Sequence, residues 1–428
     1  MQHSIAQLNA PGREERLNAL RHLKKMLDGG SIARPSTGKD VNNHIHTTFS
    51  FSPYSPSKAV WFAYMAGLST AGIMDHDSVG GVREFIEAGD ILKLPVTIGA
   101  EVRASFDDTQ FDGRKINNPD QDSCAYLALH GIPHSRIDVV AAYLEPLRMA
   151  RAVRNRKMTD NLNRLLSPAG ISIDYDRDVV PLSEWENGGE VTERHLLYAV
   201  AGKLIGEYGI GAELVGTLRE TLEIDISQKV ETKLADSSNP YVRYDLLGVL
   251  KGEFVEKFYV KATDECPHIT DLAKFAKENG IILAYAYLGD IEESVTGDKK
   301  AQKCEDEYLD ELIEYLVEIG FDAVTYMPSR NTRAQLVRLR ALCEKHGLFQ
   351  ISGEDINQPT QKFICKAMRD PFFSNLYDAA WALIGHERLA TEDISKGLFS
   401  SETKLAHPDL DYRIATYRDA AKSIMKNE

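Results

Sequence analysis

Apolar and polar positions alternate in the same way in two separate parts of this chain. In residues 41–120, short apolar runs separated by amphipathic stretches predict strands and helices in turn. The pattern returns in residues 261–370. The expected strands are Gly72–Met74, Pro95–Gly99, Ile281–Ala286, Phe321–Tyr326 and Phe349–Ser352, and the expected helices are Ser57–Gly67, Val82–Ala88, Asp271–Glu278, Glu305–Ile319 and Thr332–His346. Such alternation favours parallel βαβ units, and therefore an α/β barrel or a doubly wound sheet.

The remaining segments have mainly helical periodicity. Between the two α/β parts, residues 121–260 carry few strand signals, and we interpret them as a mostly helical insertion. Residues 1–40 are expected to form an N-terminal helical extension and a linker. Residues 371–428 are expected to form a C-terminal helical extension.

Composition and charge exclude several classes of protein. Of the 428 residues, 43% are hydrophobic and 27% are charged, which is typical of a globular protein with a sizeable core. The net charge of −14 argues against general binding to nucleic acid or to anionic membranes. No apolar run approaches the roughly 18 residues of a membrane helix, and we see no secretory signal. Five cysteines without a CxxC pair indicate reduced thiols, so we expect a cytoplasmic protein.

Histidines and carboxylates stand where several of these strands end. His44 and His46 have the spacing that puts two imidazoles on one strand face, although about a quarter of such sequences would contain this pair by chance. Asp75 and His76 follow a second strand, where a polar turn capping the next helix is an equally good interpretation. Glu101 ends a third strand; taken alone, it is more simply an exposed strand-end residue.

The order of these groups along the chain is more specific than any one of them. Asp355 follows the last strand of the second part, and in a closed parallel barrel the carboxyl ends of all strands meet at one rim. Imidazole and carboxylate ligands suit Mn²⁺, Fe²⁺ or Zn²⁺. Such an ion would activate a water molecule and polarise a phosphoryl oxygen. His76 or Asp75 would then transfer protons.

Four strings resemble, in order, the motifs of the polymerase-and-histidinol-phosphatase (PHP) superfamily of metal-dependent phosphoesterases. They are HIHTTFS, MDHDSVGG, TIGAEV and SGEDIN. The string RAVRNRKMTDNLNRLL resembles the Arg-rich helix of the superfamily's inserted subdomain, and ERHLLYAV resembles its GRPHIARAL segment. The resemblance covers about residues 41–365. It implies a distorted seven-stranded (β/α) barrel with metals at the carboxyl rim.

The resemblance also implies a partly degenerate metal site. Its first ion would be held by four residues that are all present, namely His44, His46, Glu101 and Asp355. A second ion would use Glu101 and His195, but Tyr126 stands in place of the other histidine. A third would use His76, with Phe51 and Asn357 at the other two ligand positions, where neither is a good ligand. We therefore expect one or two divalent ions. His130 and His134 lie close enough in sequence to substitute for the ligand lost at Tyr126, although exposed loop histidines are common.

Substrate contacts are predicted from arginines and from altered motif positions. Arg148, Arg151 and Arg154 recur every three residues, so they could hold a phosphate at the rim or equally form a solvated helix face. Arg330 could replace the charge of a lost metal ion, since a guanidinium binds phosphate oxygens in pairs. Tyr285, which replaces the histidine of the superfamily's LAHP motif, and Asn357 are the other two candidates.

The leading hypothesis is a metal-dependent hydrolase of a small phosphate ester, either a phosphomonoester or a nucleotide. The alternative is a catalytically reduced barrel that acts as a ligand-binding or structural module. It is motivated by the altered positions Phe51, Tyr126, Tyr285 and Asn357. A third hypothesis, hydrolysis of a C–N bond, rests on analogy between barrels alone and ranks last.

Overall fold

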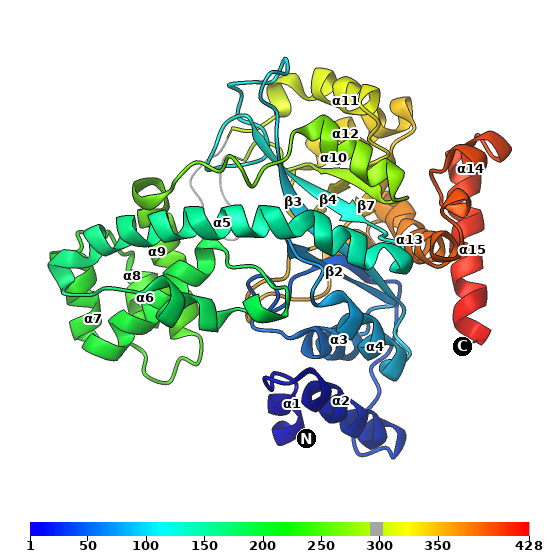
Figure 1. Ribbon diagram of the computed structural model, residues 1–428. Helices are drawn as coiled ribbons and strands as arrows, with labels where there is room; N and C mark the ends of the chain where they lie inside the picture. The colour runs from blue at the N-terminus through cyan, green and yellow to red at the C-terminus, as the bar shows by residue number, and fades with distance from the viewer. Residues whose placement is uncertain (292–302, 428) are drawn as a thin grey trace.

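The computed structural model describes residues 1–291 and 303–427, so a short piece of the second α/β part lies outside the described residues. Its centre is one seven-stranded sheet in which the strands follow one another in chain order (Figure 1). The strands are β1 (Val41–Ile45), β2 (Thr70–His76), β3 (Val96–Ser105), β4 (Cys124–His130), β5 (Ile282–Ala286), β6 (Ala323–Tyr326) and β7 (Phe349–Ser352).

Strand β4 differs from the sequence-based prediction in two ways. The sequence pattern places these residues in the helical insertion, but β4 pairs with β3 and β5 inside the sheet. Both pairings are antiparallel, whereas the other neighbouring pairs are parallel as predicted. The connection from β3 to β4 contains no helix, and strands joined without a crossover helix usually pair antiparallel. The insertion therefore begins after His130 and not at residue 121.

The two ends of the sheet approach each other and nearly close the barrel. Asn43 Nδ2 donates a hydrogen bond to the carbonyl of Ser352 (2.8 Å). Beyond β7, the Ile356 N–H donates to the carbonyl of His44 (3.1 Å), and the His46 N–H donates to the carbonyl of Ile356 (3.0 Å). These bonds bring the segment after β7 alongside β1. The predicted distorted seven-stranded barrel is confirmed.

Helices surround the barrel and extend from it. In the described residues they are α1 (Gln2–Gln7), α2 (Arg13–Asp28), α3 (Pro56–Met65), α4 (Val82–Leu92), α5 (Ile137–Leu166), α6 (Glu193–Tyr208), α7 (Ala212–Gly216), α8 (Gln228–Ala235), α9 (Val242–Phe258), α10 (Ile269–Glu278), α11 (Leu309–Glu318), α12 (Arg333–His346), α13 (Ser374–Glu392), α14 (Ser401–Ala406) and α15 (Leu410–Asn427). None of them is both long enough and apolar enough to cross a bilayer. Their starts follow local sequence signals: Ser55 caps α3 ahead of Pro56, and Thr332 forms a capping box with Gln335 at α12.

The two helical extensions pack on different sides of the barrel (Figure 1). The N-terminal helix α2 lies against α3 and α4, where the buried Arg16 guanidinium pairs with Glu84 (2.6 Å). The C-terminal helix α13 closes the amino end of the strands, because Glu387 accepts a hydrogen bond from the Ile98 N–H (2.7 Å) near the start of β3. In the described residues, α13 therefore covers the amino end of the strands, opposite to the carboxyl rim.

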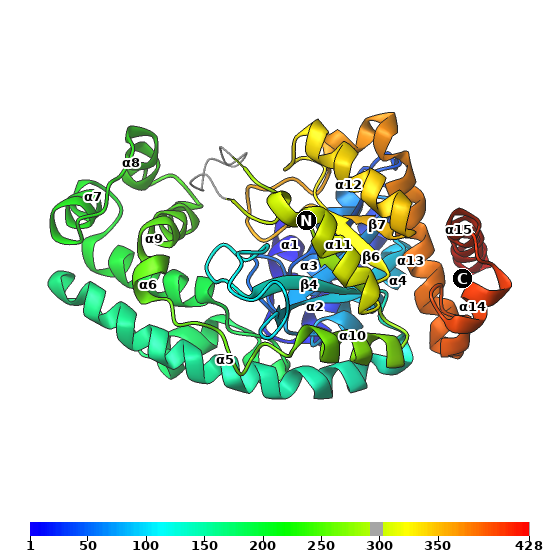
Figure 2. The same ribbon diagram turned by 90° about the horizontal axis from the view of Figure 1, so that it is seen from above.

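Helix α5 connects the barrel with the insertion. Figures 1 and 2 show this 30-residue helix running beside the barrel at one end and beside α6 to α9 at the other. The insertion has its own apolar core, to which Leu162, Leu204 and Leu250 contribute side chains that are fully buried. A long helix shared by two cores fixes the insertion over one side of the rim.

Candidate metal centre

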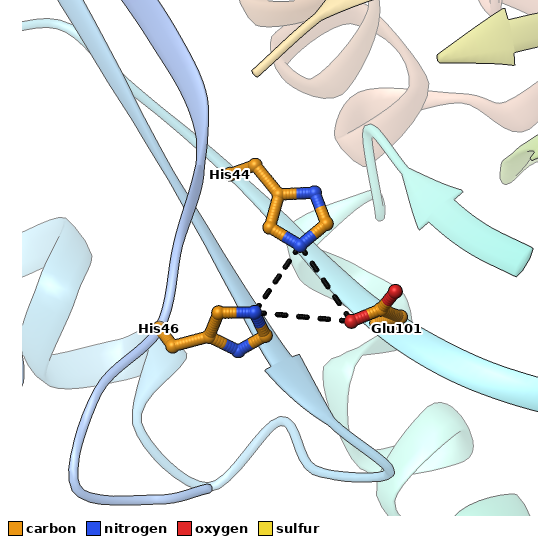
Figure 3. A group of neighbouring side chains, drawn as sticks. All are labelled: His44, His46 and Glu101. Atoms are coloured by element: carbon orange, nitrogen blue, oxygen red, sulfur yellow. Dashed lines mark hydrogen bonds and ion pairs between the residues drawn. The ribbon is translucent and has the colours of Figure 1, made fainter. Parts of the chain in front are cut away.

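Three predicted ligands meet at the carboxyl rim of the barrel. His44 lies on β1 and His46 directly follows it, while Glu101 lies on β3. Their ligand atoms point toward one another (Figure 3). The two Nε2 atoms are 3.2 Å apart, and they lie 3.6 Å (His44) and 3.8 Å (His46) from Glu101 Oε2. In the part of the chain that the structure describes, His44, His46 and Glu101 are the one group of three or more His, Cys, Asp or Glu residues whose ligand atoms all lie within 4.8 Å of one another.

Two further predicted residues border this group. Asp355 Oδ1 lies 3.2 Å from His46 Nε2, so the fourth predicted ligand also reaches the site. The hydrogen bonds between β1 and the segment after β7 place it there. His76 Nδ1 lies 3.1 Å from Glu101 Oε2, and its ring stacks on that of His46 with centroids 4.7 Å apart. The structure thus brings together five residues from four separate parts of the sequence, at or after β1, β2, β3 and β7.

The mutual charges of this cluster shift its pKa values. Burial opposes ionisation of Glu101, but three neighbouring imidazoles, first that of His76, outweigh it and lower the pKa of Glu101 to about 2. Burial likewise opposes ionisation of Asp355, yet His46 holds the pKa of Asp355 well below its usual range. For His76 burial dominates and lowers the pKa to about 3. Both carboxylates are therefore ionised at neutral pH, which cation binding requires.

Asp75 does not have the geometry of the predicted proton-transfer group. It is 1% exposed, and its carboxylate accepts three hydrogen bonds of 2.6 Å, from the Thr47 N–H, the Thr47 hydroxyl and the Ser50 hydroxyl. The Ser50 oxygen lies 3.2 Å from His46 Nδ1. Asp75 therefore fixes the loop after β1 and orients the ring of His46, as groups behind metal-ligating histidines commonly do.

His195 has another task than the one predicted. Its Nδ1 accepts a hydrogen bond from the Thr192 N–H (3.0 Å) and so caps α6. A neutral imidazole that accepts at Nδ1 carries its proton on Nε2, which leaves that nitrogen without a lone pair for a metal. Among the described residues, no hydrogen bond or ion pair joins His195 to Glu101. The predicted second ion is not supported by this arrangement.

The two proposed substitutes for the ligand lost at Tyr126 lie in different places. His134 Nε2 lies 3.5 Å from Glu387, at the amino end of the strands and so opposite to the rim, which does not fit the role. His130 lies on β4 opposite Gly99, deeper in the barrel than Glu101. Burial lowers the pKa of His130 to about 3, with smaller effects of His44 and Glu101, and its buried Nε2 has no hydrogen-bond partner in the described chain. His130 as a substitute ligand stays a prediction.

The three arginines of α5 are buried, which neither sequence-based interpretation anticipated. Arg154 pairs with Glu193 and, through Nε, with Glu265 (2.7 Å), so its guanidinium is not available for the predicted contact with substrate. Arg151 bridges Asp77 (2.6 Å) and Glu193 (2.7 Å). These ion pairs join α5, α6 and the barrel. The arginines therefore hold the insertion in place, and they are neither a solvated face nor a phosphate site.

The remaining substrate-binding candidates lie in different surroundings. Arg330 donates through Nε to the carbonyl of Leu288 (3.1 Å), while its buried Nη2 has no hydrogen-bond partner in the described chain. Tyr285 is fully buried, and burial together with the carboxylate of Glu305 raises its pKa well above the usual value. A fully buried phenol beside a carboxylate is a poor substrate contact, so this prediction lacks structural support.

Asn357 lies at the metal cluster, as predicted, but it contacts protein groups. Its Nδ2 donates to Asp355 Oδ1 (2.6 Å), and its Oδ1 accepts from Nη1 of Arg194 (3.1 Å). Sequence reasoning overlooked Arg194. The available signal was its position in ERHLLYAV, where the resembling GRPHIARAL segment has proline.

Comparison with known proteins agrees with this architecture. The family model described as the PHP domain matches residues 42–321, more than half of the chain. The chain belongs to the PHP domain family. Asp355 lies beyond the matched range, and the structure places it beside His46, as predicted. Among curated proteins, none matches the sequence.

Two solved structures share the PHP barrel at low sequence identity. One is a candidate metal-dependent phosphoesterase from Bifidobacterium adolescentis, with 19% identity and a TM-score of 0.50 over 79% of this chain and 96% of that one. The other is an amidohydrolase from Chromobacterium violaceum with bound sulfate and no metal. It has 17% identity and a TM-score of 0.50 over 76% of this chain and 90% of that one. Identities this low establish a shared fold only.

The donor atoms of this PHP site fit one divalent cation. Two imidazole nitrogens facing each other at 3.2 Å, with ionised carboxylates on either side, form a set of N and O ligands that suits Mn²⁺, Fe²⁺ or Zn²⁺. Further cations fit poorly, because Tyr126 and Phe51 offer no carboxylate or imidazole. The ring of Phe51 instead packs against that of His195 at 5.0 Å.

Proposed function

We propose that this PHP protein is a metal-dependent hydrolase of a small phosphate ester. The proposal is carried by one observation, the convergence of His44, His46, Glu101 and Asp355 at an open barrel rim. A bound divalent cation supplies an activated water and polarises a phosphoryl oxygen.

The residues of the chain would divide the remaining tasks. His76 is 25% exposed in its side chain and contacts Glu101, whereas Asp75 is buried. With its pKa lowered to about 3, the His76 ring is neutral and would hydrogen-bond the attacking water or the leaving group. Asp75, through Ser50, would keep His46 in position. Arg330, predicted to bind a phosphate oxygen, has a buried Nη2 without a hydrogen-bond partner in the described structure, so it would reach substrate only after this nitrogen is exposed.

The direct test combines metal analysis with turnover. Purified protein loaded with Mn²⁺ is expected to bind about one ion per chain and to hydrolyse at least one member of a panel of phosphomonoesters and nucleotides. His44→Ala should lose both properties. His22→Ala, an exposed histidine on α2, is the matched control and should retain them. Equal turnover by wild type and His44→Ala would contradict the proposal.

A ligand-binding protein without catalysis is the second candidate. The observation that favours it is that Phe51 and Tyr126 stand at implied ligand positions, while His195 caps a helix. Tight binding of Mn²⁺ and of inorganic phosphate without turnover of any ester would favour this function. The panel should also include a simple amide, because one structural neighbour is named an amidohydrolase. Turnover of the amide alone would change the proposed reaction class.

A further inference from the structure

Two cysteine sulfurs lie next to each other at the rim end of the sheet. Cys124 begins β4 and pairs with Ser105 at the end of β3, while Cys266 lies in the segment between α9 and α10. The two Sγ atoms are 3.8 Å apart. No hydrogen bond joins any other two cysteine sulfurs in the described residues. Cys124 is buried, whereas Cys266 is partly exposed, so the pair borders solvent on the side of Cys266.

The segment that carries Cys266 attaches the returning end of the insertion to the barrel. The Ser105 N–H at the end of β3 donates a hydrogen bond to the carbonyl of Pro267 (2.9 Å). The carboxylate of Glu265, the residue before Cys266, pairs with the buried guanidinium of Arg103 on β3. A covalent bond from this segment to β4 would therefore act at the place where hydrogen bonds and an ion pair already hold the insertion.

The surroundings of the pair favour a thiolate. A hydrogen bond from the Cys266 thiol outweighs burial and lowers the pKa of Cys124, and the positive charge of Arg103 acts in the same direction. The thiolate is the nucleophile when a disulfide forms. The remaining cysteines, all of them buried, are Cys304, Cys343 and Cys365. Burial raises the pKa of each of these three thiols to about 12, so oxidation should begin at the pair.

We propose that Cys124 and Cys266 are a site of oxidation, where a hydroperoxide such as hydrogen peroxide joins them in a disulfide that fixes the insertion to the barrel. The thiolate of the pair attacks one peroxide oxygen, the O–O bond breaks, and hydroxide leaves while a sulfenic acid remains. Hydroxide then takes the proton of the second thiol, whose sulfur attacks the sulfenic sulfur. The S–S bond forms, the S–O bond breaks, and the oxygen takes up a proton and leaves as water. In sum, two thiols lose two electrons, and one hydrogen peroxide is reduced to two water molecules.

The disulfide would close a long loop that contains the insertion. The two cysteines are 142 positions apart, and α5 to α9 all lie between them. A cross-link stabilises a protein mainly by restricting its unfolded chain, and the effect grows with the length of the loop. The oxidised protein should therefore unfold at a higher temperature than the reduced protein, because its insertion stays bonded to the barrel at the returning end.

The test treats the purified full-length chain with hydrogen peroxide, removes the excess oxidant and counts thiols in the unfolded chain. The count should fall from five to three, because two of the five cysteines are joined, and dithiothreitol should restore it. Mass spectrometry of the unreduced peptides should find Cys124 bonded to Cys266. Cys266→Ser has one thiol fewer than the five of wild type and should keep all four, whereas the matched control Cys365→Ser should fall from four to two.

Thermal unfolding tests whether the disulfide fixes the insertion. Oxidation should raise the melting temperature of wild type and of Cys365→Ser by a few degrees, and it should leave that of Cys266→Ser unchanged. Oxidation without a bond between the two sulfurs, or an equal loss of thiols in Cys266→Ser, would overturn the inference. A cross-linked protein that melts like the reduced one would also overturn it. The peptide map of wild type needs no variant, and no outcome depends on turnover, so the proposed function is tested separately.

Discussion

Glu190 should make the stability of this protein fall as the pH rises. Its side chain is fully buried beside the junction of insertion and barrel. The carboxyl oxygen Oε1 accepts a hydrogen bond from the Val191 N–H (2.6 Å), whereas Oε2 has no hydrogen-bond partner in the described structure. Burial raises the pKa of Glu190 from 4.5 to about 8; Arg151 opposes this rise and Asp77 adds to it. Because the folded state binds the proton more tightly, the stabilisation is complete below pH 4.5 and is lost as the pH rises toward 8.

The size of this effect follows from linkage. Each pH unit within that window changes the free energy of unfolding by up to about 1.4 kcal/mol, so the sum between pH 5 and pH 8 is about 3 kcal/mol. Glu190→Gln cannot ionise and keeps an acceptor for Val191. Urea denaturation of both proteins from pH 5 to pH 8 should therefore show the variant gaining about 3 kcal/mol on the wild type across this range. Glu186→Gln, an exposed neighbour, should show no such gain. If the difference in free energy of unfolding between wild type and Glu190→Gln stays constant with pH, the reasoning is refuted.

Three other substitutions test contacts around the site. Asp75→Asn should weaken Mn²⁺ binding by about tenfold to a hundredfold in titration calorimetry, because the loop that orients His46 loses its charged hydrogen-bond acceptor. An unchanged affinity would contradict this role of Asp75. Gly353→Ala should also weaken Mn²⁺ binding, since a Cβ there would clash with the Cβ of His44. A normal affinity would show that His44 can shift freely. Arg151→Met should cost about 3–5 kcal/mol in urea denaturation, because the buried carboxylate of Asp77 loses its partner, whereas Glu193 keeps Arg154. A loss below about 1 kcal/mol would argue against a buried ion pair.

The convergence of the candidate ligands could be predicted because it depends on a rule of topology. Parallel strands deliver their carboxyl ends to one rim, so His44, Glu101 and Asp355 had to converge once the order of strands was known. The helix starts at Ser55 and Thr332 were equally accessible, because a cap depends on neighbours within three residues.

The errors arose where the partner of a residue lies far away in sequence. The spacing of Arg148, Arg151 and Arg154 shows that they share a face, but it does not show that Glu193 and Glu265 face them. Likewise β4 has no helix before it, and only its pairing with β3 and β5 reveals a strand of the barrel. In both cases tertiary contacts override the local pattern.

Three consecutive residues at the start of α6 make three different kinds of contact. Glu193 receives ion pairs from Arg151 and Arg154, which anchor this helix end to α5 and the barrel. Arg194 extends from the same turn to the metal cluster, and His195 caps the helix that carries both. Because the ion pairs fix the turn from which Arg194 reaches, disturbing them should displace its guanidinium. Arg151→Met should therefore release the hydrogen bond from Arg194 to Asn357 while His44 and His46 keep their positions, and a crystal structure of the variant would show whether it does.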